Sequence, residues 1–364
     1  MHLVESLYIH FPFCKHLCNY CDFYKAIPQD FGQDLLNFHQ LFEREWTEHQ
    51  KLMLEEKVQM KSLKTLYIGG GTPSLWKEEG ALFLKNFLQQ NQLDFDPEYE
   101  FTMEVNPATW TDQGLSAWRE SGVNRFSIGV QSYREDFLKI LDRVHDLSEV
   151  KKTLQYFSNI GVNYSIDLML GLPHSEELKR DVIEELKALL NYGPSHFSVY
   201  ILTVKPQYKH YSHLPSESYI ENEYLKVAEF LKSYGFVHYE VSNYALPQKE
   251  SQHNLQYWKG ASVAAIGPSA TGFFHQENQA LRYKWKTTDH AFERERLTEK
   301  ELKFEQIYLG LRTTLGLKES NLSVQNVAVC DAWISRKLAT KSEGFYRLNS
   351  NGYLLLDSLI LELN

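Results

Sequence analysis

Short apolar runs alternate with longer amphipathic stretches through the first two-thirds of this 364-residue chain. Six of the runs have the length and composition of buried strands, and the stretches between them place apolar residues at helical spacing. This alternation predicts an α/β fold, a parallel sheet connected by crossover helices. The predicted strands cover residues 7–13, 65–69, 100–105, 125–130, 164–170 and 196–201, and 219–233 followed by 238–241 could add a seventh unit.

The pattern changes after residue 245. Glycine, serine and alanine mix with aromatic residues over 252–272, which predicts a loop. Helices are expected over 299–315 and 326–339, followed by a hairpin with strands 344–348 and 353–356 that turns through 349–352. We therefore expect a core over 1–245, a linker region over 246–298 and a small winged-helix-like α+β domain over 299–364.

Charge and hydropathy exclude several classes of protein. The formal net charge is −9 and no long basic run is present, so nucleic-acid binding has no support. No apolar run is long enough to span a bilayer, and the first six residues lack the features of a secretory signal. We therefore expect a cytoplasmic protein, in which clustered cysteines indicate metal or redox chemistry more often than disulfides.

Three of the four cysteines, Cys14, Cys18 and Cys21, lie within eight residues. Three thiolates from one tight loop suit an iron–sulfur cube and leave one iron without a protein ligand. A structural zinc site is the competing interpretation, with His16 or the distant Cys330 as a fourth ligand. The spacing favours the cube, and Cys330 is expected to be a buried apolar residue.

Polar residues stand at the ends of the predicted strands, where active sites of β/α barrels lie. Glu104 and Asp167 end apolar strands, and an unpaired carboxylate there would be costly. A ribose hydroxyl, a cationic ligand or a buried ion pair would each explain them. Glycines 69–71 would let the backbone approach a ligand closely, with free N–H and C=O groups.

The cysteine triplet after a strand resembles the signature of the radical S-adenosylmethionine (SAM) superfamily. Residues 7–14, 69–73, 103–107, 125–132 and 166–173 are similar, in the same order, to the oxygen-independent coproporphyrinogen III oxidase branch. The resemblance implies a partial (β/α)6 TIM-type barrel, with a 4Fe–4S cluster on the three cysteines and SAM on the open iron. The implied SAM contacts are Tyr8, Tyr20, Gly70, Gly71, Thr72, Glu104, Gln131, Arg143 and Asp167.

Within that branch the chain looks most like the HemW-like heme chaperones. Phe23 stands where the oxidases have a further cysteine, and only 13 residues precede Cys14, whereas oxidases carry a longer arm. Residues 253–258 read His-Asn-Leu-Gln-Tyr-Trp, similar to the HNxxYW element by which these chaperones hold heme. The resemblance makes His253 the candidate heme ligand in the 246–298 region.

The resemblance also implies partners. They are heme itself, acceptor hemoproteins of the respiratory chain, an electron donor and a possible transient contact with the membrane. The alternative function is the oxidase reaction, radical SAM decarboxylation of coproporphyrinogen III. The chain departs from the family pattern at 204–208 and 265–270, which indicates a divergent member of the family.

Overall fold

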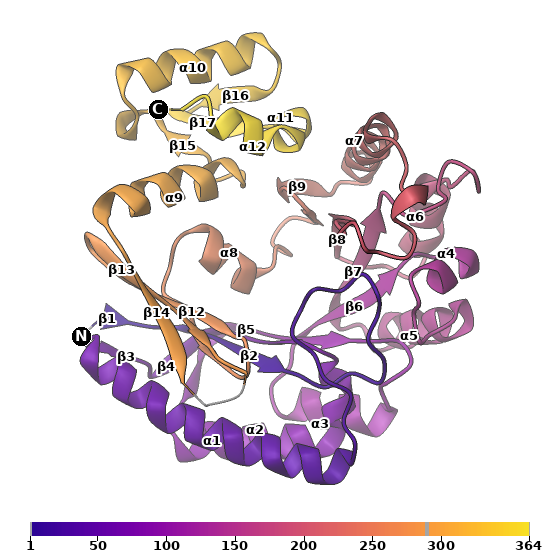
Figure 1. Cartoon of the computed structure of the whole chain (residues 1–364), viewed down its shortest axis with the longest axis vertical. Coiled ribbons are helices and arrows are strands. Elements are labelled where there is room, and N and C mark those ends of the chain that lie inside the picture. Colours follow the sequence, from indigo (N-terminus) through magenta and orange to yellow (C-terminus); the bar gives the residue numbers. More distant parts are fainter. Residues whose placement is uncertain (1, 288–290, 364) are drawn as a thin grey trace.

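The computed structural model describes residues 2–287 and 291–363, so residues 288–290 of the predicted linker region lie outside the described residues (Figure 1). A nine-stranded sheet forms the core, in the order β11-β2-β4-β5-β6-β7-β8-β10-β9. Neighbouring strands from β11 to β8 are parallel, whereas β10 is antiparallel to β8 and to β9. The α/β fold class and the six predicted strands are confirmed. Their bounds are Ser6–Phe11 (β2), Ser62–Gly70 (β4), Asp94–Val105 (β5), Arg125–Gln131 (β6), Asn163–Leu170 (β7) and His196–Ile201 (β8), with Val237–Glu240 (β9), Asn243–Ala245 (β10) and Ala264–Ile266 (β11) at the edges.

Crossover helices cover the outer face of the curved sheet (Figure 1). Their first turns are capped by the side chains that such positions prefer, including Asp30, Thr111 and Ser216. Asp146 and Glu149 form a reciprocal capping box. The helices are Phe31–Glu55 (α1), Lys77–Gln90 (α2), Asp112–Glu120 (α3), Glu135–Ile140 (α4), Leu147–Ile160 (α5), Val182–Leu190 (α6) and Glu217–Ser233 (α7), with the short strands His2–Leu3 (β1) and Val58–Gln59 (β3) beside α1 and a 3-10 turn at Pro73–Trp76 (η1).

The strand register brings polar positions together at the carboxyl ends of the central strands. Glu104 of β5 lies opposite Ser127 of β6, and Gly129 of β6 lies opposite Asp167 of β7. Because the carboxyl ends of parallel strands lie on the same side of the barrel, the side chains of Glu104, Ser127 and Asp167 face a common space there.

The predicted loop over 252–272 is wrong. This stretch contains the helix Gln252–Trp258 (α8), the strand β11 and the start of the strand Thr271–Gln276 (β12). Strand β12 pairs with Gln279–Trp285 (β13), which pairs with Phe292–Leu297 (β14), all antiparallel. Strand β13 contributes to the core: Tyr283 is buried and its hydroxyl lies 2.6 Å from Nε2 of His49 on α1.

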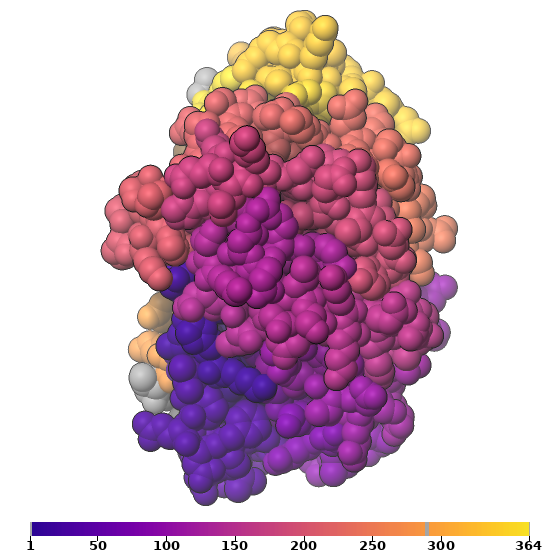
Figure 2. Space-filling model, turned by 90° about the vertical axis from the view of Figure 1, so that its right-hand side faces the viewer, coloured from indigo at the N-terminus to yellow at the C-terminus, as the bar shows by residue number. Residues whose placement is uncertain are grey.

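The C-terminal residues form a small unit at one end of the molecule (Figures 1 and 2). It contains the helices Glu299–Leu311 (α9), Val324–Ser335 (α10), Ser350–Leu354 (α11) and Leu356–Ile360 (α12) and the strands Leu317–Lys318 (β15), Ala339–Ser342 (β16) and Phe345–Leu348 (β17), with a 3-10 turn at Glu319–Asn321 (η3). The predicted hairpin is misplaced. It is formed by β16 and β17 and turns at Glu343 and Gly344, both with positive φ. Asn349 instead caps α11 by accepting from the backbone N–H groups of residues 351 and 352.

Arg312, just after α9, joins this unit to the barrel. Its guanidinium lies 4.4 Å from the centre of the Trp258 ring on α8, and its Nε is 3.4 Å from Oε2 of the buried Glu240. The backbone carbonyl of Arg312 also accepts from the Val241 N–H. The end of α9 and the end of α8 are therefore fixed to the same edge of the sheet. Across the described ranges, none of the helices has the length and apolar character to cross a bilayer.

Candidate functional site

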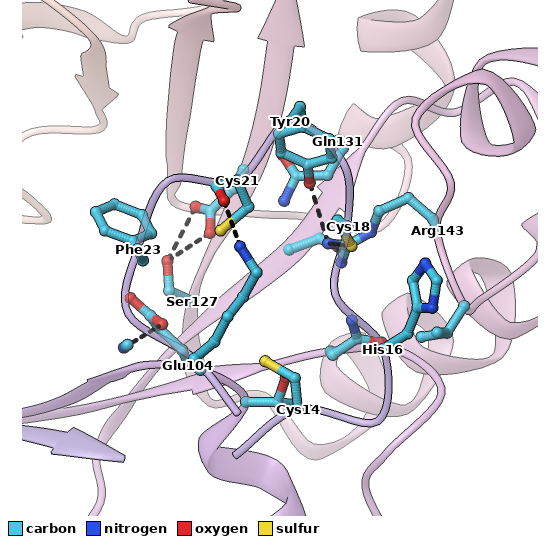
Figure 3. A pocket seen from close by; sticks show the side chains of 18 of the residues that line it. Cys14, His16, Cys18, Tyr20, Cys21, Phe23, Glu104, Ser127, Gln131 and Arg143 are labelled. Carbon is cyan, nitrogen blue, oxygen red and sulfur yellow. Dashed lines mark hydrogen bonds between the residues drawn. The ribbon is translucent and has the colours of Figure 1, made fainter. Parts of the chain in front are cut away.

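A cavity of about 550 Å³ opens at the carboxyl ends of the parallel strands (Figure 3). Its size is within the range of ordinary ligand sites. The loop between β2 and α1, which carries the cysteines, forms one wall. Most of the site residues predicted from sequence line this single cavity: Cys14, Cys18, Cys21, Tyr20, Gly70, Gly71, Thr72, Glu104, Gln131, Arg143 and Asp167.

The three cysteines surround one end of the cavity as free thiols (Figure 3). Cys14 is buried, and burial raises the pKa of its thiol. Groups that favour thiolates face the sulfurs: Thr72 Oγ1 donates to Cys14 Sγ at 3.3 Å, and Arg143 Nη1 lies 3.8 Å from Cys18 Sγ. Lys25 Nζ donates to the carbonyl of Cys21. This donor set fits a thiolate-bound iron–sulfur cluster.

The two alternative fourth ligands of a zinc site have other roles. His16 lines the cavity, but its Nε2 lies within hydrogen-bond distance of Asp142 Oδ2, at 2.8 Å. Cys330 is fully buried in α10, within the core of the C-terminal unit. The cysteine loop therefore offers three cysteine sulfurs on one side of an open space, the arrangement that leaves one metal position for a further ligand.

Two carboxyl groups face the cavity from neighbouring strands. Glu104 accepts from the Tyr67 hydroxyl at 2.9 Å and from the Gly70 N–H at 3.2 Å, yet burial raises its pKa to about 7. Asp167 accepts from Ser127 at 2.9 Å, and burial raises its pKa to about 6. Neither acid forms an ion pair with a described residue, which removes the buried-ion-pair interpretation. A cationic or hydroxyl-bearing ligand would supply what these carboxyl groups lack.

Gln131 and Arg143 also line the cavity. Gln131 has a φ of +68°, a strained value for a residue with a side chain. Arg143 does not lie on the surface: it donates to the Tyr20 hydroxyl at 3.1 Å and to the Gly129 carbonyl at 3.0 Å. Its Nε is buried without a hydrogen-bond partner. Because Arg143 lines the cavity, a carboxylate bound there would pair with its guanidinium.

Gly70 and Gly71 line the cavity as predicted, and both are also required for packing. A Cβ on Gly70 would lie 2.6 Å from the ring of His10, and a Cβ on Gly71 would lie 2.7 Å from the Phe13 carbonyl. The N–H of Gly70 donates to Glu104 and that of Gly71 to the Phe11 carbonyl at 2.7 Å. These N–H groups are therefore not free, and the glycines first of all permit close packing of β4 against β2.

Two predicted residues lie outside the cavity wall. The Tyr8 hydroxyl is 3.2 Å from Nδ1 of His10, and Tyr8 does not line the cavity. His253 on α8 is 1% exposed, its Nδ1 is 2.8 Å from Thr65 Oγ1, and its Nε2 has no hydrogen-bond partner. Burial, and secondarily the charge of Arg125, lowers the pKa of His253 to about 3. The imidazole is therefore neutral. Its Nδ1 is held by the hydrogen bond with Thr65, and its Nε2 has no hydrogen-bond partner.

Several residues of the site were not predicted. Tyr67 and Ser127 line the cavity, and Glu100 accepts from the N–H groups of Gln252 and His253 at 3.0 Å, which caps α8. Tyr67 and Ser127 could have been found from the two-residue alternation of side chains along a strand, because they precede Gly69 and Gly129 by two positions. The partner of Glu100 comes from a distant segment, and the sequence holds no signal for that contact.

The radical SAM superfamily model matches residues 8–182 of this chain. The heme chaperone HemW of Bacillus subtilis (strain 168) is 31% identical over 336 residues, which cover 88% of this chain and 86% of that protein. The heme chaperone HemW of Escherichia coli (strain K12) is 34% identical over 280 residues, which cover 73% of this chain and 69% of that protein. Among solved structures, the coproporphyrinogen III oxidase HemN from Escherichia coli, a radical SAM enzyme, superposes with a TM-score of 0.80 at 20% identity and covers 99% of this chain and 89% of that one.

Proposed function

Because this chain belongs to the HemW family of the radical SAM superfamily, we propose that it binds heme, a 4Fe–4S cluster and SAM, and passes heme to acceptor hemoproteins. The observation that carries the proposal is the 31% sequence identity to a HemW protein in an alignment that covers 88% of this chain. That alignment covers much more of the chain than the superfamily match, which is limited to residues 8–182. We further propose that the protein acts in the cytoplasm on acceptors of the respiratory chain, with an electron donor and transient contact with the membrane.

The cavity residues divide between cluster and SAM. Cys14, Cys18 and Cys21 would hold the cluster, which supplies an electron when it is bound. Glu104 and Asp167 would orient the cationic and hydroxyl-bearing parts of SAM. Because burial raises the pKa of Glu104 to about 7, a cationic group that binds beside it at or below that pH would release a proton from it. Arg143 would take the carboxylate, and Tyr20, Gly70, Gly71, Thr72 and Gln131 complete the wall.

The heme ligand we propose is Nε2 of His253. Neutral imidazole is an ordinary axial ligand of heme iron, and a second nitrogen held by a hydrogen bond is typical of metal-binding histidines. Since His253 is 1% exposed, a porphyrin reaches it only if α8 shifts from its present position. Tyr8 does not line the cavity, and we propose that it packs near the heme site, since the centre of its ring lies 6.4 Å from that of the His253 ring.

Heme titration of the anaerobically purified protein tests this proposal. We expect the wild type to bind heme with a shifted Soret band, and His253→Gln to lose that shift, whereas His275→Gln, on β12, keeps it. An unchanged spectrum for His253→Gln would remove the residue from the role, and a wild type that binds no heme would refute the chaperone function.

Phe23 provides the test against the oxidase reaction. Its side chain is 72% exposed at the cavity mouth, at the position where the resemblance places a cysteine in oxidases. We expect no protoporphyrinogen when the reconstituted protein is incubated anaerobically with SAM, reductant and coproporphyrinogen III. Clear turnover would contradict the proposal.

A further inference from the structure

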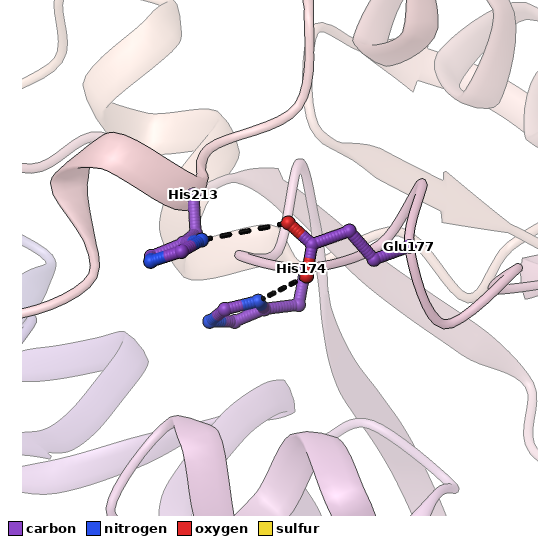
Figure 4. A group of neighbouring side chains, drawn as sticks. All are labelled: His174, Glu177 and His213. Atoms are coloured by element: carbon purple, nitrogen blue, oxygen red, sulfur yellow. Dashed lines mark hydrogen bonds and ion pairs between the residues drawn. The ribbon is translucent and has the colours of Figure 1, made fainter.

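Two histidines and a glutamate converge outside the cavity, on the two loops that follow β7 and β8 (Figure 4). His174 and Glu177 belong to the loop between β7 and α6. His213 belongs to the loop over residues 202–216, between β8 and α7, and lies in the 3-10 turn Tyr211–His213 (η2). One ligand atom from each side chain lies within 4.8 Å of the others. We propose that His174, Glu177 and His213 bind a zinc ion that clamps these two loops together.

The geometry of the three side chains suits such an ion. His174 Nδ1 donates to one oxygen of Glu177 at 2.8 Å, and His213 Nδ1 donates to the other at 3.4 Å. Ligand atoms around tetrahedral zinc, with bonds of about 2.0–2.1 Å, lie about 3.3 Å apart. A small movement of the exposed carboxylate would therefore let the ion replace the two protons that now link imidazoles and carboxylate. Two histidines, one glutamate and a water form a ligand set that zinc commonly adopts.

The backbone holds the two imidazoles in place before any ion binds. The His174 N–H donates to the His213 carbonyl at 2.8 Å, and the two rings stack with centroids 4.1 Å apart. His174 has a φ of +63°, an unfavourable conformation for a residue with a side chain. Next to it, Glu176 accepts from both the N–H and the hydroxyl of Ser216 at 2.8 Å. A site assembled in advance loses less entropy when it binds its ion.

The loop over residues 202–216 also packs against the loop that carries the cysteines. Tyr208 is buried in an apolar cluster with Met169, and Tyr20 of the cysteine loop packs against that cluster. Lys205 Nζ also forms an ion pair with Asp22 Oδ1 at 3.1 Å. The segment 204–208, where the chain departs from the family pattern, is thus the connection between the proposed zinc site and the loop that carries Cys18 and Cys21. Zinc would stiffen this connection.

Competition between the tag-free full-length protein and a chromophoric chelator for Zn²⁺ alone tests the site. Zinc bound by the thiols is common to all variants and cancels in the comparison. We expect the His174→Gln/His213→Gln variant to bind one equivalent fewer than the wild type, and His213→Gln to lose more than about tenfold in affinity, since even outer-shell partners of metal ligands contribute about 10–100-fold. His2→Gln, an exposed histidine on β1, should equal the wild type. Equal zinc binding by the wild type and the double variant would overturn the site.

Hydrogen exchange tests the clamp separately. Backbone amides over 205–214 should exchange more slowly when Zn²⁺ is added to the wild type and should not respond in His213→Gln. Zinc binding without slower exchange would overturn the clamp. Neither measurement uses heme or SAM, so its outcome is independent of the function proposed above.

Discussion

Replacement of Glu104 by glutamine should make the cofactor-free protein more stable at pH 8 and, at the same time, weaken SAM binding. Burial raises the pKa of Glu104 from 4.5 to about 7. In the folded state the carboxyl group therefore resists ionisation, whereas in the unfolded chain it ionises freely. Glutamine can keep both contacts, because its oxygen can accept from Gly70 and its amide can donate to the Tyr67 hydroxyl.

The raised pKa determines whether Glu104 stabilises or destabilises the fold at a given pH. Below pH 4.5 the group is protonated in both states and costs nothing; between pH 4.5 and about 7 the unfolded state gains from ionisation, and the folded state loses stability. Each pKa unit corresponds to about 1.36 kcal/mol, so the full shift corresponds to about 3 kcal/mol at pH 8. Because the cavity admits water, we expect Glu104→Gln to raise the free energy of unfolding by about 1–3 kcal/mol at pH 8 and by almost nothing at pH 4.

Urea unfolding of both proteins at pH 4 and pH 8, followed by circular dichroism, measures the difference. Glu45→Gln is the matched control, since burial also raises the pKa of Glu45 to about 7, while its carboxyl group accepts from the Gly267 N–H and neither residue lines the cavity. Both variants should gain stability with pH, but only Glu104→Gln should lose about tenfold or more in SAM affinity. No gain at pH 8, or an equal gain at both pH values, would refute the reasoning.

Two other predictions concern the cluster and the core. Cys18→Ser should abolish the visible absorption of a reconstituted iron–sulfur cluster, whereas Cys330→Ser should retain it; equal spectra would exclude the cysteine loop as the cluster site. Arg180 is fully buried and pairs with Glu185 at 2.7 Å and Glu223 at 3.4 Å. Arg180→Leu would leave two buried carboxylates unpaired and should lower the free energy of unfolding by about 3–5 kcal/mol in urea titrations. A loss below about 1 kcal/mol would contradict the importance of this buried ion pair for stability.

The barrel and most of its cavity could be predicted because their signals are local. Each of the six strands is a short apolar run, and polar residues at strand ends must meet when the strands are parallel. After residue 245 the helices predicted over 299–315 and 326–339 correspond to α9 and α10, but the segment between 252 and 297 gave no such signal. In β14 charged side chains face solvent beside β13, so this strand resembles exposed surface until its pairing is known. Gly352 likewise indicates a turn, but its lack of a side chain serves close packing, because a Cβ there would lie 2.2 Å from the Leu338 carbonyl.

The burial of His253 also depends on distant residues. Thr65 binds its ring and Glu100 caps its helix, and both come from strands more than 150 positions earlier. Sequence could identify the histidine as unusual, but the shielding of its Nε2 follows only from the way α8 packs in the barrel.

The guanidinium of Arg312 has a consequence for how heme and a protein partner could influence each other. It contacts Trp258 at the end of α8 and Glu240 at the edge of the sheet, and it directly follows α9. A ligand that binds better when α8 is displaced must weaken these contacts. By thermodynamic reciprocity, a protein that binds α9 and weakens the contacts of Arg312 would raise the affinity for that ligand. A protein that strengthens these contacts would favour release of the ligand. The binding of heme and of the partner protein would then be coupled through Arg312, although the two ligands share no binding surface.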